Sequence, residues 1–270
     1  KRGIHSMVKF AIMGQGTVGS GVVEVHTTHA DSITSRAKQE IDIKYILDLR
    51  EFPDSPLADR FTKSFDDILN DPEILVVVEV MGGLHPAYDY VKSCLEAGKS
   101  VVTSNKELVA AKGAELLKIA QEKNLNFLFE ASVGGGIPII RPMSQCLAAN
   151  DVVEVAGILN GTTNFILTKM INEDMSFEDA LALAQKLGYA ERNPAADVEG
   201  HDACRKICIL ASLAYGKHVY PDQVHTEGIT NISLADVKYA DAWGGVVKLI
   251  GEVSKTPEGK LHSIVCPMFI

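Results

Sequence analysis

The chain has 270 residues, of which 46% are hydrophobic and 23% charged, and its formal net charge at pH 7 is −9. This length allows one large domain or two modest ones, and the composition is typical of an ordinary globular protein. The acidic balance, without a basic run, argues against nucleic acid as a partner, and no apolar run reaches the roughly 20 residues that span a membrane.

Short apolar strands alternate with helical patterns over the first half of the chain. The strands are predicted at 8–13, 41–47, 75–81, 100–103 and 125–129, and the helices at about 18–40, 87–98 and 107–123. Near-continuous apolar strands joined by helices are typical of a parallel sheet that is covered on both faces. We therefore expect an α/β fold over this half, and we interpret residues 1–6 as a short tail outside it.

A glycine-rich turn, Gly14-Gln-Gly16-Thr-Val-Gly19, joins the first predicted strand to the first predicted helix. Gly14 permits the tight turn, Gly16 lets the backbone approach a pyrophosphate, and Gly19 lets the helix pack close to the strand. This context predicts a Rossmann-type site for NAD(P), although a glycine-rich turn of another α/β fold is an alternative. The predicted loop contacts are Gly14, Gly16, Thr17, Val18 and Gly19.

The ends of the later strands supply the other expected cofactor contacts. The second strand ends in Asp48-Leu49-Arg50, where an acid would hold the ribose 2′-hydroxyl of NAD and an arginine would meet the 2′-phosphate of NADP. The preference between the two cofactors is therefore left open. Gly82, Ser104 and Lys106 follow further strands and are expected near the nicotinamide, although Lys106 could also be an exposed lysine of no consequence.

After about residue 150 the alternation of strands and helices changes. Strands are predicted at 152–159, 246–253 and 261–266, and helices at 163–172, 176–187 and 201–216. We therefore expect a dinucleotide-binding domain over 7–150 and a second, α+β domain over 151–270.

Four carboxylates and one lysine lie in the Pro- and Gly-broken segment 188–206. Asp202 and Lys206 are four residues apart, so they share one face of a helix and resemble a catalytic pair. An ordinary surface ion pair is the alternative. Asp197 and Glu199 are favoured as turn and capping residues before that helix.

The five cysteines are scattered and form no CxxC pair. This pattern fits a reducing compartment, so we expect a cytoplasmic protein. Cys204 and Cys208 are favoured as packing residues rather than as a redox pair.

Four strings in order behind the glycine-rich turn resemble the homoserine dehydrogenase family. They are Ser104-Asn-Lys-Glu-Leu-Val109, Glu130-Ala-Ser-Val-Gly-Gly-Gly-Ile-Pro138, Leu159-Asn-Gly-Thr-Thr-Asn164 and Asp197-Val-Glu-Gly-His-Asp-Ala-Cys-Arg-Lys206. The resemblance runs from about Val8 to Ile270, and the last two strings are its most specific parts. It implies an NAD(P)-dependent oxidoreductase that interconverts L-homoserine and L-aspartate 4-semialdehyde, in the aspartate-derived biosynthesis of threonine, methionine and isoleucine.

The resemblance also implies a role for particular residues. In that family the lysine that matches Lys206 is the proposed proton donor and acceptor at the substrate oxygen. The acids that match Glu191 and Asp202 hold the substrate, chiefly its amino group, and the lysine that matches Lys106 lies by the nicotinamide and the substrate. We accordingly expect Lys206, Asp202 and Lys106 to be catalytic, and Glu191, Asp202 and Lys106 to bind substrate. Gly188 and Glu191 are expected near the cofactor.

Two further features come only from the resemblance. The family holds a monovalent cation, usually sodium, largely through carbonyl oxygens, at the positions that match Glu130, Val133, Gly135 and Ile137. The family also suggests a homodimer through the sheet of the second domain. The second domain is thus expected to serve for substrate binding and dimerisation.

The family normally continues for several dozen residues beyond this point, so we expect a truncated chain. A catalytically impaired NAD(P)-binding fragment is therefore one alternative, and another amino-acid pathway oxidoreductase with the same first domain is a second. An aspartate-semialdehyde dehydrogenase would need a reactive cysteine in an electropositive loop, and none of the five cysteines occupies one.

Overall fold

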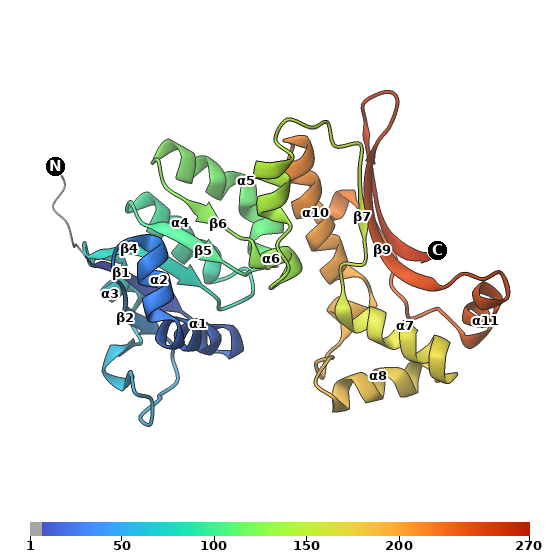
Figure 1. Ribbon diagram of the computed structural model, residues 1–270, viewed down its shortest axis with the longest axis horizontal. Helices are drawn as coiled ribbons and strands as arrows, with labels where there is room; N and C mark the ends of the chain where they lie inside the picture. Colours follow the sequence, from blue (N-terminus) through green and yellow to red (C-terminus); the bar gives the residue numbers. More distant parts are fainter. Residues whose placement is uncertain (1–6) are drawn as a thin grey trace. The chain divides into compact units, whose positions relative to one another are not determined.

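The computed structural model describes residues 7–270, so the segment 1–6, which we interpreted as a tail, lies outside the described residues. The chain divides into two compact units, Lys1–Gly136 and Ile137–Ile270 (Figure 1). This division lies before the one expected after residue 150. The reason is a π-helical turn, η2 (Pro142–Cys146), which packs against helix α10 (His201–Tyr215) of the second unit.

The first unit contains a six-stranded parallel sheet in the order β3-β2-β1-β4-β5-β6. Its strands are β1 (Val8–Met13), β2 (Ile41–Leu47), β3 (Phe61–Thr62), β4 (Ile74–Glu79), β5 (Ser100–Thr103) and β6 (Phe127–Leu128). Its helices are α1 (Thr17–Thr28), α2 (Ala30–Ala37), η1 (Ala58–Arg60), α3 (Phe65–Leu69), α4 (Ala87–Glu96), α5 (Lys106–Glu122) and α6 (Ala131–Gly134). This strand order is that of the Rossmann fold, which confirms the predicted fold class.

The register of the strands aligns their carboxyl ends, so the loops that follow them lie at the same end of this sheet. Met13 at the end of β1 pairs with Leu47 of β2 and with Glu79 of β4, and Glu79 pairs in turn with Thr103 of β5. The connections from β1 and from β4 run in opposite directions along the sheet, so right-handed crossovers place α1–α2 and α4–α5 on opposite faces (Figure 1). The carboxyl ends of β1, β2, β4 and β5 therefore meet at the switch point where such folds bind ligands.

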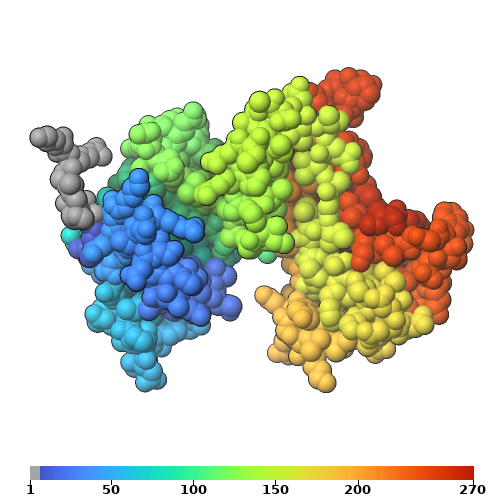
Figure 2. All heavy atoms as spheres, in the orientation of Figure 1, coloured from blue at the N-terminus to red at the C-terminus, as the bar shows by residue number. Residues whose placement is uncertain are grey.

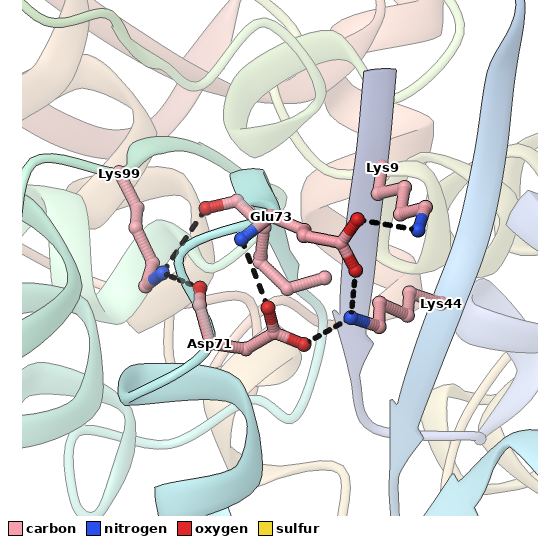
Figure 3. Close-up of polar contacts among 6 residues, drawn as sticks. Lys9, Lys44, Asp71, Glu73 and Lys99 are labelled. Atoms are coloured by element: carbon pink, nitrogen blue, oxygen red, sulfur yellow. Dashed lines mark hydrogen bonds and ion pairs between the residues drawn. The ribbon is translucent and has the colours of Figure 1, made fainter. Parts of the chain in front are cut away.

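A network of charged side chains lies near the amino ends of the strands, at the opposite end of the sheet (Figure 3). The carboxylate of Glu73 accepts hydrogen bonds from Lys9 and Lys44, and Lys44 also pairs with Asp71. Lys99 is buried, and its Nζ donates to the carbonyl oxygens of Asp71 at 2.6 Å and Ile74 at 3.0 Å. Burial lowers the pKa of Lys99, and these two carbonyls solvate the ammonium. The network thus fastens the turn before β4 to β1, β2 and the start of β5.

The second unit contains a four-stranded sheet in the order β7-β9-β10-β8. Its strands are β7 (Glu154–Gly157), β8 (His225–Thr226), β9 (Val247–Lys255) and β10 (Leu261–Phe269), and β9 and β10 form an antiparallel hairpin whose turn projects from this unit (Figure 2). Besides η2 and α10, its helices are α7 (Gly161–Glu173), α8 (Phe177–Lys186), α9 (Ala195–Val198), η3 (Pro221–Gln223) and α11 (Leu234–Ala242). Helices α7 and α10 pack on the sheet, and Ile166, Leu167 and Ile207 are fully buried between these layers. This mixed sheet with helices confirms the expected α+β unit.

Several predicted boundaries are wrong. The helix expected over 18–40 is two helices that meet at His29, whose φ of −116° interrupts the helical backbone. The strand expected over 75–81 ends at Glu79, because the Glu79 carboxylate accepts a hydrogen bond from the backbone N–H of Met81 and turns the chain. The short elements β3, α3, α6, β8 and α11 were not predicted.

Candidate functional site

The turn after β1 has the geometry that its glycines suggest. Gly14 has a φ of +105°, and a Cβ atom on Gly19 would lie 2.0 Å from the Gly14 carbonyl oxygen, so only glycine fits at Gly19. A Cβ on Gly16 would meet nothing within 4 Å. The loop is thus tightly packed on the side that faces the sheet and open at Gly16, where a ligand could approach the backbone of the loop.

The start of α1 presents backbone donors. Gly16 is its N-cap, no side chain among residues 7–270 caps it, and no acidic residue stands in its first turn. Thr17 and Val18 are exposed in that turn. The first N–H groups of a helix have no partner within the helix and favour an anion, so this terminus suits a phosphate.

Asp48 and Arg50 form a bidentate pair at the end of β2. Arg50 donates from Nε to Oδ1 of Asp48 at 3.0 Å and from an Nη to Oδ2 at 2.9 Å. Backbone N–H groups of Arg50 and Gln15 also donate to the same carboxylate. The Arg50 guanidinium and these amides hold the pKa of Asp48 well below its usual range. Both oxygens of Asp48 are therefore occupied by this chain's own donors.

A cleft of about 440 Å³ opens beside this pair within the first unit. The lining that matters here comprises Gly14, Gln15, Gly16, Asp48, Arg50 and Lys63. Oε1 of Gln15 is buried and has no hydrogen-bond partner among the described residues, so it offers an acceptor to a ligand. An open glycine, helix N–H groups and two cations around one cleft fit a phosphate-bearing nucleotide.

Hydrogen bonds stiffen the ends of β4 and β5. Glu79 is fully buried and accepts from the Thr103 hydroxyl at 2.6 Å, and that hydroxyl oxygen accepts from the backbone N–H of Asn105. Asn105 caps α5 and donates through Nδ2 to the Gly83 carbonyl oxygen at 2.6 Å. Three predicted contacts lie in these loops: Gly82 at a φ of +76°, Ser104 directly after β5, and Lys106 as the half-buried first residue of α5.

The second unit holds a buried polar cluster made from two strings of the sequence. Lys206 and Asp202 lie on α10, with Nζ 2.7 Å from Oδ2 and exposed side-chain fractions of 16% and 4%. Lys206 also donates to the Leu159 carbonyl oxygen at 2.9 Å. Asn160, which precedes α7, donates from Nδ2 to Oδ1 of Asp197 at 2.7 Å and to Oδ2 of Asp202 at 2.9 Å. The low exposure rules out the alternative of an ordinary surface pair for Asp202 and Lys206.

Glu191 and Gly188 lie in the turn after α8. Both are exposed, Gly188 has a φ of +80°, and the backbone carbonyl of Glu191 accepts a hydrogen bond from Gln185. The same turn is tied to α7 through Thr162, whose hydroxyl donates to the Tyr189 carbonyl oxygen at 2.7 Å. The turn is thus anchored by its backbone, which leaves the Glu191 carboxylate at the surface.

The four positions expected to hold sodium surround α6 and the end of the first unit. Glu130 is the N-cap of α6, Val133 lies buried within it, and Gly135 follows it with a φ of +60°. Ile137 is 72% exposed and belongs to the second unit. Between Met7 and Ile270 no group of three or more His, Cys, Asp or Glu side chains is placed to hold a metal ion.

The structure gives site positions to residues for which the sequence analysis suggested another role or none. Asp197 was favoured as a capping residue, but α10 is capped by Gly200 without a side-chain bond, and Asp197 instead joins the Asn160 cluster. Asn160 carried a signal, since Asn is a preferred N-cap and stands directly before a helical pattern. Gln15 lies within the glycine-rich turn and could have been included with it, whereas Lys63 had no signal, because only the fold brings it to the cleft.

A Rossmann-type unit with an open phosphate loop, joined in one chain to an α+β unit with a buried lysine–carboxylate cluster, defines the class of two-domain NAD(P)-binding proteins. The family model for homoserine dehydrogenase matches residues 138–270, and the model for the homoserine dehydrogenase NAD-binding domain matches residues 14–130. The chain therefore belongs to the homoserine dehydrogenase family of oxidoreductases.

Individual relatives agree with this assignment. Homoserine dehydrogenase of Pseudomonas aeruginosa is 43% identical over 264 residues, which cover 96% of this chain and 61% of that protein. The Bacillus subtilis enzyme is 40% identical over 266 residues, with 97% of this chain and 61% of the relative covered. The crystal structure of a homoserine dehydrogenase from Thiobacillus denitrificans is similar at a TM-score of 0.92 and 39% identity, over 98% of this chain and 62% of that one. The chain thus spans about 61% of the length of these two curated relatives.

A further structural neighbour contains a bound cofactor, and the helices of this chain bear on membrane insertion. A hyperthermophilic archaeal homoserine dehydrogenase mutant, solved in complex with NADPH, matches at a TM-score of 0.81 and 27% identity, over 98% of this chain and 82% of that one. Among the helices of residues 7–270, none is both long enough and apolar enough to cross a membrane.

Proposed function

We propose that this chain carries the NAD(P)-dependent homoserine dehydrogenase activity, the interconversion of L-homoserine and L-aspartate 4-semialdehyde. The observation that carries the proposal is the buried pair of Lys206 and Asp202 in the string most specific to the family. The reaction serves the biosynthesis of threonine, methionine and isoleucine from aspartate. A catalytically impaired NAD(P)-binding fragment remains the second candidate, because the chain spans about 61% of its relatives' length.

The residues of the first unit would hold the cofactor. Gly14, Gly16, Thr17, Val18 and Gly19 form the turn and helix start that suit the pyrophosphate. When bound there, a nicotinamide cofactor would supply the hydride-transfer chemistry of the reaction. Gly82, Ser104 and Lys106 follow strands whose carboxyl ends form the ligand-binding edge.

Lys206 would move the hydroxyl proton. A neutral amine has two N–H groups, and Lys206 has two acceptors, the Asp202 carboxylate and the Leu159 carbonyl oxygen. The nitrogen lone pair would then accept the proton of the substrate hydroxyl, while the hydride would leave the carbon that bears this hydroxyl. In the reverse direction the third N–H of the ammonium would donate to the aldehyde oxygen.

The carboxylates of the second unit would hold the amino acid. Glu191 and Asp202 carry negative charges that suit the substrate ammonium group. Gly188 and Glu191 share the anchored turn after α8, and both residues would contribute to the cofactor site.

We favour NADP over NAD as the cofactor of the first unit. Asp48 already accepts four hydrogen bonds from Arg50 and Gln15, so a ribose 2′-hydroxyl would have to displace one of them. Arg50 and Lys63, both lining the cleft, could meet a 2′-phosphate instead. The NADPH complex of an archaeal relative supports this choice.

Sodium, self-association and location complete the proposal. Sodium would lie at Glu130, Val133, Gly135 and Ile137, where loop carbonyl oxygens suit a hard cation. The chain would form a homodimer through the sheet of the second unit. The five cysteines are free thiols, which supports a reducing, cytoplasmic compartment.

The test is a steady-state assay of the full chain with L-homoserine and either NAD or NADP, followed by the absorbance of the reduced nicotinamide. We expect turnover, with a Lys206→Ala variant that binds the cofactor normally but is inactive. Cofactor binding without any turnover by the wild-type chain would instead support the impaired fragment. A Lys206→Ala variant with full activity would refute the role of Lys206.

A further inference from the structure

Asn160 lies at the centre of the buried cluster in the second unit, and all its amide hydrogen-bonding groups have partners. Oδ1 accepts from the backbone N–H of Thr163 at 2.8 Å and from the Thr163 hydroxyl at 3.0 Å. Nδ2 donates to Asp197 at 2.7 Å and to Asp202 at 2.9 Å. The residue is only 4% exposed, so water has little access to replace any of these bonds.

The orientation of the Asn160 amide follows from its partners. The backbone N–H of Thr163 can only donate, so the amide atom that faces it must be the oxygen. The two hydrogens of Nδ2 are then directed to carboxylates, which can only accept when ionised. The helix cap of α7 therefore determines where the two donors of Asn160 point.

The cluster contains two carboxylates and one ammonium. Lys206 compensates Asp202 directly through the same Oδ2 that accepts from Asn160, whereas the amide links Asp197 to this pair. Since a neutral donor adds no charge, Asn160 holds both acids without changing the net charge around Lys206.

We propose that Asn160 is a positioning residue, whose amide fixes Asp197 and Asp202 and so orients Lys206 toward the substrate oxygen. This inference rests on the proposed homoserine dehydrogenase function. It adds Asn160 and Asp197 to the residues on which that function depends, and it links the cap of α7 to the acids of α9 and α10.

Two variants separate the donor role of Asn160 from its capping role. Ser is also a preferred N-cap, so Asn160→Ser keeps a cap for α7 but has no donor that reaches both acids. Asn160→Asp keeps the Oδ1 acceptor and adds a negative charge in place of the two donors. Ser176→Ala removes the cap of α8 and is the matched control, since the Ser176 hydroxyl accepts from the backbone N–H of Asp179 and donates to its carboxylate, away from the cluster.

We expect Asn160→Ser to lower kcat by roughly 10- to 100-fold, because charged acceptors lose a hydrogen bond. We expect Asn160→Asp to change the pH profile of homoserine oxidation, because a carboxylate replaces the two donors that face Asp197 and Asp202. Ser176→Ala should keep the wild-type pH profile. If both Asn160 variants keep the wild-type kcat and pH profile, the inference is wrong and Asn160 is only a helix cap.

A structural measurement keeps this test separate from the proposed function. Crystal structures of the wild-type chain and of Asn160→Ser should show altered side-chain rotamers of Asp197 or Asp202 in the variant. Unchanged rotamers of both acids would overturn the positioning role even if the chain proves inactive with homoserine. Conversely, altered rotamers in Asn160→Ser, found together with a wild-type chain that is inactive with homoserine, would sustain the positioning of the acids and refute only the proposed function.

Discussion

We expect Gly228 to be essential for the position of the backbone at Val198–Glu199 in the second unit. A Cβ atom at this position would lie 2.0 Å from the Val198 carbonyl oxygen and 2.4 Å from the Glu199 Cα. Both atoms are backbone, so neither can rotate away as a flexible side chain would. The adjoining hydrogen bond, from the Ile229 N–H to the Val198 carbonyl oxygen at 2.8 Å, holds the two segments together. Gly228→Ala must therefore push Val198–Glu199 away.

The size of this effect follows from the contact distances. Real Cβ atoms essentially never approach other heavy atoms closer than 3.0 Å, so the backbones must separate by about 1 Å. Overpacking of this kind typically costs about 1–3 kcal/mol. Because Asp197 and Asp202 flank the displaced residues, and a 1 Å misplacement can cost about 100-fold in rate, we expect kcat to fall by about that factor.

Urea unfolding and steady-state kinetics would measure both effects of Gly228→Ala. We expect a lower unfolding midpoint with an unchanged m-value, a lower kcat, and unchanged NAD(P) binding by the first unit. Gly157→Ala is the matched control in the same unit, since its Cβ would make only an ordinary contact, 3.9 Å from Leu159. The reasoning would be refuted by a Gly228→Ala protein with the wild-type midpoint and kcat.

Three further predictions concern the first unit. Lys99→Met should cost roughly 1–3 kcal/mol of unfolding free energy, measured by urea titration, because the carbonyls of Asp71 and Ile74 lose their buried donor; equal stability would contradict the bracing role of Lys99. Arg50→Ala should raise the KM for NADP by roughly 10- to 100-fold, because a charged donor to the 2′-phosphate is lost, and should leave the KM for NAD nearly unchanged. A parallel rise in the KM for both cofactors would count against a preference for NADP. Arg50 holds the pKa of Asp48 in the native state below the unfolded value of about 3.9. The pair therefore stabilises the native state above that pH, and this stabilisation is lost as the pH falls through the lower native pKa. The stability difference between the wild type and Asp48→Asn should accordingly be constant above about pH 4 and shrink in more acidic solution, and a difference that grew with acid would reverse our assignment.

Local sequence patterns predicted the elements whose signals lie within a few residues. The strands β1, β2 and β5 match their predicted bounds, since each is a run rich in apolar residues flanked by turn residues. The strands β3 and β8 have two residues each and exist only through pairing with β2 and β10, so no periodicity marks them.

The same distinction applies to the candidate site. Asp202 and Lys206 could be paired from their spacing of four, which is a local property of helices. Asn160 is 37 residues from Asp197 and 42 from Asp202, and no periodicity links such positions. Burial was also inaccessible from the sequence. It depends on how α7, α9 and α10 pack, and it is what separates the pair of Asp202 and Lys206 from an ordinary surface salt bridge.

The acceptor at Leu159 shows how the sheet builds this cluster. Gly251 lies in β9, opposite Gly157 of β7, and a Cβ atom on Gly251 would come within 2.8 Å of the Leu159 side chain. This missing side chain lets Leu159 approach the strand, and its carbonyl oxygen then reaches Lys206. A glycine on a buried strand, which by itself weakens a sheet, thus supports one of the two acceptors that hold the amine. The proton-transfer geometry that we propose for Lys206 therefore depends on a strand that contributes no functional side chain to it.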